Sequence, residues 1–438
     1  MADAARRLGG RRGQLLVMFA VSGMLDEAVK ELTDRFETRL ARKVVYAAGE
    51  QLPFRLAQVK VGNEPRRGVR AELYRSILAA VEEVNPILEE RTRMLHEKAR
   101  ELGFRSYAEL SLSFKSFRVD ELRQAASVLC RETEGLYSSE MERMLEEKAG
   151  VSLREAERHD VAYLFRATEF DKYFPAEEMV GKLLKTIKGM GLELRGVKLD
   201  IEARPRKSPR AFCAPVRVPW DVRLVVMPKG GFDDYMALFH EAGHALHAAY
   251  TSPELPAELR RLWEGSVAET YAFLVEYLLT CESWLKEHTE LKGGELRRFL
   301  RLQGLYKLYY LRRYAGKVEY ELRLHSDGLA EAREWYVQEL QSRLIFKQPH
   351  QYYLYDVDDM MYSADYLAAW LVEAQLRSYL ASELGEHWYA REEAGKLLRR
   401  LWSRGGEPTV RELLSEAGYS KLNARPLIEE AKMMIEEK

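Results

Sequence analysis

The residues best suited to chemistry in this 438-residue chain are His240, Glu241 and His244, which form an H-E-x-x-H motif. The motif lies inside the apolar run Phe239–Tyr250, whose pattern predicts a helix. Residues four apart lie about 40° apart around a helix, so both imidazoles can reach one metal ion. Two neutral nitrogens and a carboxylate suit zinc, and Glu241 is placed to approach a water on that ion. The motif therefore predicts a hydrolytic metal centre.

A third protein ligand is needed, and the next helical run offers three carboxylates. Glu264, Glu269 and Glu276 follow His244 by 20, 25 and 32 residues. Glu269 and Glu276 share a helix face, whereas Glu264 points about 140° away from Glu269. His247 lies on the face of the motif, and we interpret it as a supporting or packing histidine rather than a ligand. Spacing alone leaves the choice among the three carboxylates open.

Composition limits the classes of protein to consider. Hydrophobic residues make up 47% and charged residues 31%, which supports a large folded core. The net charge of −1 argues against a globally basic nucleic-acid binder. No apolar run reaches the roughly 20 residues that span a bilayer. The three cysteines lie far apart, which excludes a disulfide scaffold and suits a reducing compartment, so we expect a cytoplasmic location.

The first 24 residues carry an expectation of their own. Leu15–Met24 is the longest apolar run and follows four arginines, which resembles the start of a signal peptide. The helical pattern continues directly from Leu25, however, without a clear small-residue cleavage site. We interpret residues 1–24 as an N-terminal extension, which is either a helix or a disordered stretch upstream of the true start.

The remaining pattern indicates how the chain is organised. It is almost entirely helical from Leu25 to Met190, and helical again from Phe232 onward. Between these blocks, alternating stretches rich in strand formers predict a small sheet: Leu192–Ala203, Ala211–Val218 and Val222–Met227. We therefore predict a helical N-terminal lobe over residues 25–195 and a catalytic lobe over residues 196–438, with a cleft between them.

These segments resemble the zinc oligopeptidases typified by oligoendopeptidase F and thimet oligopeptidase. The similarity is carried by FDDYMALFHEAGHALH at 232–247 and by SVAETYAFLVEYLL at 266–279. In that family the third ligand lies 25 residues after the second histidine, and another glutamate follows it by seven. The resemblance implies that His240, His244 and Glu269 bind one Zn²⁺ per chain, as in a gluzincin, and that Glu276 supports them.

The same resemblance implies the fold. It is that of a mostly α, two-lobed, zincin-like metallopeptidase, with a small β-sheet beside the active-site helix. RAFCAPVRV, at 210–218, resembles the family's substrate-side edge strand. Family members have a longer N-terminal region than the roughly 240 residues that precede the motif here, so the outer wall of the substrate channel is expected to be reduced.

The C-terminal segment supplies candidates for stabilising an oxyanion. Family members carry a tyrosine cluster before a long helix, with a histidine upstream. Tyr362 and Tyr366 match this cluster by their four-residue spacing, and His350 is the upstream candidate. Ser363–Asp365 replace the family's glycine-rich turn, and His350 lies farther upstream than in the family. The resemblance implies catalytic roles for Tyr366, Tyr362 and His350 beside Glu241.

The sequence as a whole predicts a zinc metallopeptidase with a water activated by Glu241, and the resemblance implies that its substrates are short peptides. The alternative is a catalytically silent helical interaction protein that retains the zinc motif, although such a protein would not require Glu241. Nucleic-acid binding through arginines is disfavoured, and Arg312–Arg313 is interpreted as a solvated helix face. We expect peptide partners, no nucleic acid and no membrane. The oligomeric state, monomer or homodimer, stays open.

Overall fold

The computed structural model describes residues 9–204, 207 and 211–436, and most of these residues are helical. The helices of the first part are α2 (Gly10–Arg42), α3 (Phe54–Asn63), α4 (Arg67–Glu82), α5 (Asn85–Glu101), α6 (Tyr107–Leu112), α7 (Val119–Glu132), α8 (Glu134–Ala149), α9 (Arg158–Arg166) and α10 (Met179–Gly189). The later helices are α11 (Phe232–Tyr250), α12 (Ala257–Arg261), α13 (Gly265–Glu276), α14 (Glu282–His288), α15 (Gly293–Asp327), α16 (Ala332–Leu344), α17 (Tyr362–Leu384), α18 (Glu392–Trp402), α19 (Val410–Glu416) and α20 (Arg425–Glu436).

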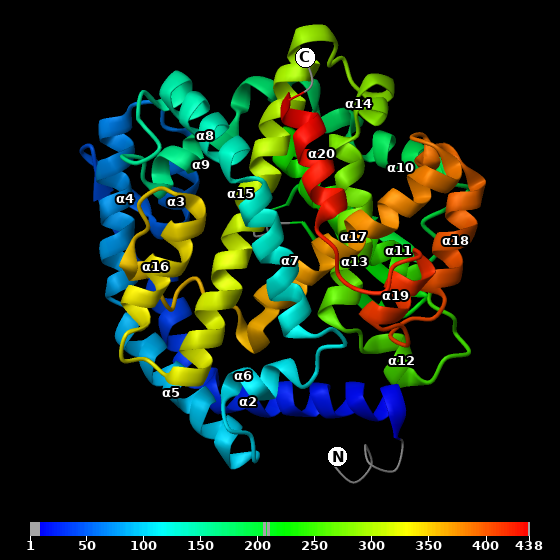
Figure 1. Cartoon of the computed structure of the whole chain (residues 1–438), viewed down its shortest axis with the longest axis horizontal. Coiled ribbons are helices and arrows are strands. Elements are labelled where there is room, and N and C mark those ends of the chain that lie inside the picture. Colours follow the sequence, from blue (N-terminus) through cyan, green and yellow to red (C-terminus); the bar gives the residue numbers. More distant parts are fainter. Residues whose placement is uncertain (1–8, 205–206, 208–210, 437–438) are drawn as a thin grey trace.

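The helices form two groups on either side of α15, as Figure 1 shows. The 35-residue α15 packs against α16 on one side and against α17 and α20 on the other. Next to it, α11, α13 and α17 form consecutive pairs of packed helices. These three helices are apolar around much of their surface, because each is covered by neighbours on several sides. The predicted mostly α, two-lobed fold is confirmed.

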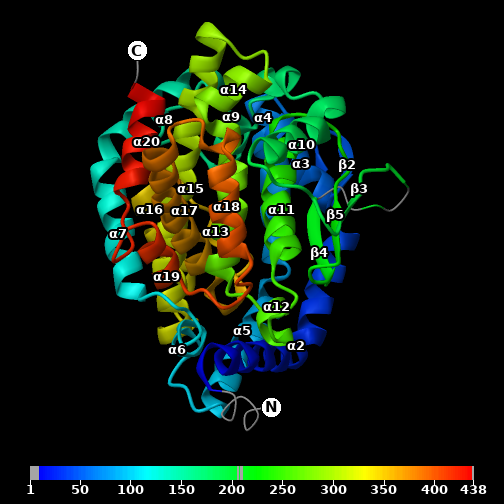
Figure 2. The same ribbon diagram turned by 90° about the vertical axis from the view of Figure 1, so that its right-hand side faces the viewer.

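A three-stranded sheet lies beside α11 (Figure 2). Its strands are β3 (Val197–Asp200), β4 (Phe212–Arg217) and β5 (Asp221–Val225), in the order β3-β5-β4. The central strand β5 pairs parallel to β3 and antiparallel to β4. β4 is therefore an edge strand, and it packs against α11. The three predicted strand regions all contain a strand.

The prediction of an almost entirely helical stretch from Leu25 to Met190 did not include a β-hairpin that the structure contains. β1 (Val44–Ala47) and β2 (Glu50–Pro53) form an antiparallel hairpin. Ala48 and Gly49 close its turn with φ values of 49° and 78°, the left-handed conformation that two-residue hairpin turns require. Adjacent β-branched and aromatic residues at the start of the hairpin favour a strand, although they also fit a helical spacing.

Most of the predicted N-terminal extension lies in a helix. From Gly10 onward the residues belong to α2, which continues without interruption through residue 24 to Arg42. Leu15, Val21 and Leu25 are buried on one face of this helix, so the apolar run serves packing. The helical alternative therefore holds from Gly10, and residues 1–8 lie outside the described residues.

Segments from the two halves of the chain pack against each other across the predicted boundary between the lobes. The short helix η4 (His350–Tyr352) belongs to the C-terminal half, yet it packs against α4 and α16. One continuous apolar core includes residues from Leu40 to Ile435. The division at residue 195 falls between α10 and β3 and stays a prediction.

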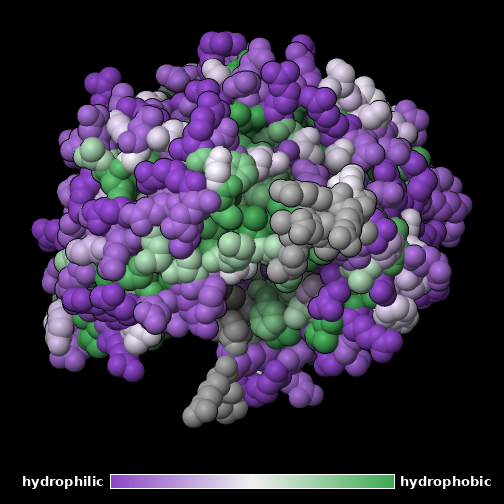
Figure 3. Space-filling view, turned by 90° about the horizontal axis from the view of Figure 1, so that it is seen from below, coloured by the Kyte–Doolittle hydropathy of each residue, from purple (hydrophilic) through white to green (hydrophobic). Residues whose placement is uncertain are grey.

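The lower face of the molecule carries a band of apolar residues, which Figure 3 shows. α2 runs along this face (Figure 1), with Phe19 58% and Met24 54% exposed. They line a surface hollow of about 720 Å³ between α2 and the end of α5. Among the described residues, no helix has the combined length and apolar character to cross a bilayer.

Candidate metal centre

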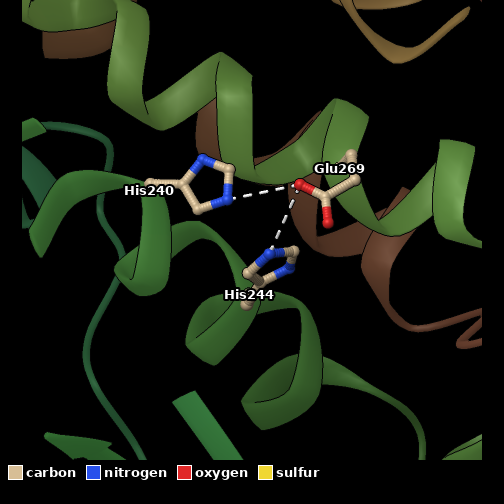
Figure 4. Close-up of side chains that lie close together, drawn as sticks. All are labelled: His240, His244 and Glu269. Atoms are coloured by element: carbon tan, nitrogen blue, oxygen red, sulfur yellow. Dashed lines mark ion pairs between the residues drawn. The ribbon is translucent and has the colours of Figure 1, made fainter. Parts of the chain in front are cut away.

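Two helices bring three potential ligands together, as Figure 4 shows. α11 supplies His240 and His244, and α13 supplies Glu269. Oε2 of Glu269 lies 3.2 Å from Nε2 of His240 and 3.7 Å from Nε2 of His244. Within the described part of the chain, these residues are the one group of at least three histidine, cysteine or acidic side chains whose ligand atoms all lie within 4.8 Å of one another. Glu269, which the resemblance selected as the third ligand, therefore faces both imidazoles.

The close approach of the two helices depends on Gly243, inside the motif. A Cβ atom built on Gly243 would lie 2.5 Å from Cα of Ala272 and 2.7 Å from the carbonyl oxygen of Tyr271. Both of those atoms belong to the backbone of α13, so only glycine fits without moving the helix. Glycine is unfavourable inside a helix, and here the small residue is what lets the two sets of ligands meet.

A second carboxylate orients the first histidine from behind. Nδ1 of His240 lies 2.7 Å from Oε2 of Glu276, one of the partners that ligand histidines commonly have. Burial opposes protonation of His240, but the carboxylates of Glu269 and Glu276 raise its pKa to about 10. Burial lowers the pKa of His244 to about 4. Nε2 of His240, which faces Glu269, is the atom placed for a metal.

The residues present fit a divalent metal ion. Oε2 of Glu269 is buried and accepts no hydrogen bond from any described residue, although two imidazole nitrogens lie close to it. A buried carboxylate oxygen in this state is unfavourable unless a cation completes its surroundings. Two imidazoles and one carboxylate are a donor set that zinc accepts while keeping one position open.

Glu241 lies beside the ligands and is held by the sheet. The backbone N–H of Cys213, on the edge strand β4, donates a hydrogen bond of 2.8 Å to Oε2 of Glu241. Burial raises the pKa of this carboxyl, while His240 and the Cys213 amide lower it. A raised pKa brings a carboxylate closer to the range in which it accepts and returns a proton.

Tyr362 and Tyr366 lie next to the cluster, on the first two turns of α17. The hydroxyl of Tyr362 donates a hydrogen bond of 2.8 Å to Oε1 of Glu269. The ring of Tyr366 packs 4.9 Å from that of Tyr362, and its hydroxyl makes no hydrogen bond to any described residue. Burial raises the pKa of Tyr366, as do the charges of Glu269 and Glu241, so its hydroxyl keeps its proton.

Three solved structures have a similar fold. The first is described as an oligoendopeptidase F from Bacillus anthracis strain Ames, with a TM-score of 0.67 and 17% identity over 93% of this chain and 73% of that one. A 3.1 Å structure of an oligoendopeptidase F gives 0.69 and 16%, over 93% of this chain and 74% of the other. PZ peptidase A with an inhibitor gives 0.71 and 16%, over 98% and 80%.

The chain has the fold of oligoendopeptidase F. No family model matches the sequence, and no curated protein matches it. The likeness to the oligoendopeptidase F structures therefore concerns the path of the backbone. The assignment of each side chain rests on the contacts in this protein.

The other candidates from the sequence have structural partners. Glu264 forms an ion pair of 2.7 Å with Arg11 and accepts hydrogen bonds from the backbone and the hydroxyl of Ser116. It therefore fastens α2 to the start of α13, on an oligoendopeptidase-like scaffold, and stays away from the metal cluster. His247 is buried between aromatic rings, and its Nε2 lies 3.2 Å from the carbonyl oxygen of Gly405.

His350 is not brought together with the other predicted catalytic residues. It is exposed and lies on η4, which packs against α4 and α16. Among the described residues, it makes no hydrogen bond or ion pair with the metal cluster.

Sequence reasoning missed two residues that shape this site. Gly265 lies against Tyr362, because a Cβ atom there would come within 2.6 Å of the tyrosine ring. Cys213 contributes its backbone amide to Glu241, and the identity of its side chain gives no sign of this contact. A glycine at the start of an apolar helix was the available signal for the first. The second becomes visible only when strand and helix are packed together.

Proposed function

We propose that this protein is a zinc-dependent metallopeptidase that hydrolyses peptide bonds of short peptides. The observation that carries the proposal is the convergence of His240, His244 and Glu269 next to Glu241. A purely structural metal site has no need for an additional acidic group, such as Glu241, that lies beside the ligands without binding the metal. The names of the structural neighbours, oligoendopeptidase F and PZ peptidase A, support a peptidase reaction.

Zinc in this site would supply a Lewis acid that polarises the peptide carbonyl and lowers the pKa of water. Nε2 of His240, a ring nitrogen of His244 and Oε2 of Glu269 would hold the ion. Glu241 takes the proton of the attacking water and delivers it to the leaving amine. The Cys213 amide keeps the carboxylate of Glu241 in one orientation during both transfers.

Tyr366 is the proposed donor to the oxyanion that develops on the carbonyl. Its side chain is partly exposed, its hydroxyl is uncommitted among the described residues, and its raised pKa keeps it a donor. Tyr362 has a different task, because its hydroxyl already donates to Glu269. It fixes the carboxylate so that the other oxygen faces the histidines. No role is proposed for His350, which lies on η4 against α4.

The substrate would lie along β4, the edge strand nearest to Glu241. An edge strand presents unpaired backbone groups that an extended peptide can bind. Short peptides are the proposed substrate class because of the resemblance to oligopeptidases. The three cysteines are free, which fits the proposed location in a reducing, cytoplasmic compartment.

The test is mass-spectrometric mapping of cleavage in a mixed peptide library. We expect cleavage by the purified protein, loss of cleavage with a chelator, and recovery when zinc is added back. Glu241→Gln should bind zinc yet cleave about a thousandfold more slowly, because only the proton acceptor is lost. A folded, zinc-loaded wild type that cleaves no peptide would instead support the interaction protein.

A further inference from the structure

The turn before α17 has an unfavourable backbone conformation at two consecutive residues. Met360 and Met361, at the end of the short helix η5 (Asp359–Met361), have φ values of 52° and 50°. Residues with side chains rarely adopt this left-handed region, because the Cβ atom then comes too close to the backbone. The turn is followed at once by Tyr362, the first residue of α17. Its conformation therefore sets where Tyr362 and Tyr366 lie.

A row of polar residues on α15 faces this turn. We call it the α15 ladder, and its members follow one another at intervals of four residues: Arg313, Lys317, Glu321 and His325. They are 8%, 2%, 0% and 3% exposed. The interpretation of Arg312–Arg313 as a solvated face is therefore wrong, since Arg312 is 0% exposed as well. Burying so many ionisable groups is unfavourable unless each meets a specific partner.

The upper part of the ladder holds the segment that leads into the turn. Arg313 forms an ion pair with Asp356. One turn later, Nζ of Lys317 lies 2.8 Å from Oδ2 of Asp358. Consecutive turns of a rigid helix thus bind alternate residues of the incoming segment and fix its path along α15.

Glu321 reaches both sides of the strained turn. Its Oε1 accepts a hydrogen bond of 3.0 Å from the backbone N–H of Asp358, which precedes the turn. Its Oε2 accepts a hydrogen bond from the hydroxyl of Ser363, which follows the turn. The buried side chain of Glu321 therefore links the residues that flank Met360 and Met361.

The lower end of the ladder supports the turn itself through Tyr107 of α6. The hydroxyl of Tyr107 accepts a hydrogen bond of 3.0 Å from the backbone N–H of Met360. Its ring lies 4.8 Å from that of His325, and Nδ1 of His325 lies 3.0 Å from Nε2 of His96. From the side of α5, Arg91 forms a two-point ion pair with Asp359.

We propose that Glu321 is a positioning residue, which holds the Met360–Met361 turn so that Tyr362 and Tyr366 face the metal centre. The role in turnover rests on the proposed peptidase function, whereas the role in placing Tyr362 does not. Gly265, at the start of α13, also packs against the Tyr362 ring. Without the two hydrogen bonds to Glu321, Met360 and Met361 can leave the left-handed conformation. The start of α17 then shifts, and both tyrosines move away from Glu269.

Kinetics of Glu321→Ala give the first test. We expect kcat to fall about tenfold to a hundredfold, because a displacement of about 1 Å at catalytic groups has that effect. At saturating zinc, the metal content and KM should stay near the wild-type values, since Glu321 contacts neither the three ligands nor β4. Glu319→Ala is the matched control on the same helix, because Glu319 pairs with Arg123 away from the turn. It should retain wild-type kcat.

A rescue separates positioning from general damage to the fold. Glycine adopts positive φ without strain, so Met360→Gly lowers the energy of the turn and reduces the need for a clamp. Added to Glu321→Ala, it should restore part of kcat. Glu321→Gln keeps the size and an acceptor oxygen, and should lose less kcat than Glu321→Ala. A loss of kcat that merely parallels a loss of folded, zinc-loaded protein would overturn the proposal.

A crystal structure of Glu321→Ala gives a readout that does not depend on turnover. We expect the 2.8 Å hydrogen bond between Tyr362 and Glu269 to be broken and the φ values of Met360 and Met361 to become negative. If this happens in a protein whose wild type cleaves no peptide, the positioning role holds and the proposed function fails. If the turn and Tyr362 stay in place, the proposal is overturned even in an active peptidase.

Discussion

Two buried helices of this protein carry polar side chains four residues apart, and they differ in what those side chains meet. On α11, His240 and His244 converge on one carboxylate oxygen that lacks a hydrogen-bond donor. On α15, each of the four members of the ladder meets a partner on a neighbouring segment, and Lys317 and Glu321 share Asp358. The same spacing therefore forms a site that fits a cation on α11. On α15 it forms a row of side chains whose partners are already present in the protein.

The difference teaches that spacing becomes informative through the residue types that it places together. Two imidazoles and a glutamate at H-E-x-x-H positions have few uses apart from metal chemistry. Arginine, lysine and glutamate at the same spacing resemble the ion pairs of an exposed helix. The sequence of the α15 ladder alone would equally fit an exposed helix face, and only the packing of neighbouring segments shows that it is buried.

The largest effect is expected when the third ligand is removed. Glu269→Ala should weaken zinc binding by more than about a hundredfold, because a direct ligand contributes more than the groups behind it. Glu264→Ala is the matched control: it should keep zinc and lower the thermal stability, since it leaves Arg11 without its partner. Zinc content by mass spectrometry and melting temperature distinguish the two. The reverse pattern would move the third ligand to residue 264.

Glu276→Gln should have a smaller effect on the same site. The amide still reaches Nδ1 of His240 but no longer carries the charge that makes the imidazole a stronger ligand. We expect zinc affinity to fall about tenfold to a hundredfold, measured by competition with a chelator of known affinity. Unchanged affinity would show that Glu276 only packs against the histidine.

Gly243→Ala should lower stability by about 1–3 kcal/mol, because the new methyl group meets the backbone of α13. α11 and α13 must then separate, so zinc affinity should fall together with the free energy of unfolding. Gly294→Ala on α15 is the control, since a Cβ atom there meets nothing within 4 Å. Urea unfolding of both variants checks this; equal stability of the two would contradict the close approach.

The α15 ladder should show itself in the pH dependence of stability. Burial raises the pKa of Glu321 from 4.5 to about 8, against the opposing effect of Lys317. The folded state therefore holds a proton that the unfolded state releases, and stability is lost as pH rises from 4.5 through about 8.

The matching variant is Glu321→Gln, which removes this titration. The free energy of unfolding of the wild type, relative to the variant, should fall by up to about 1.4 kcal/mol per pH unit over that range. Urea unfolding at pH 5 and at pH 8 measures the change. A difference that grows with pH would show that Glu321 is charged in the folded protein.

Much of the fold and the first half of the site could be predicted from sequence. Helical periodicity and three alternating stretches gave the architecture, and His240, Glu241 and His244 are recognisable because they are adjacent on one helix. Glu269 needed the family resemblance, since its distance from His244 in the chain says nothing about which carboxylate turns inward. The β1–β2 hairpin was missed because Val44 also fits a helical spacing.

The contacts that complete the site are long-range. The Cys213 amide, the Gly265 contact with Tyr362 and the α15 ladder each join segments that are separated in the chain. His350 was suggested by the resemblance, which places a histidine upstream of the tyrosine cluster, whereas in the structure it lies on η4, which packs against α4. Such pairs depend on how helices cross, which local patterns do not specify.

The central claim is that a single divalent ion is shared by two imidazoles of α11 and one carboxylate of α13. Anomalous X-ray diffraction from zinc-soaked crystals, collected on both sides of the zinc absorption edge, tests it most directly. We predict one strong peak about 2.0–2.2 Å from the ligand atoms of His240, His244 and Glu269. A peak elsewhere, or no peak between these side chains at saturating zinc, would contradict the account.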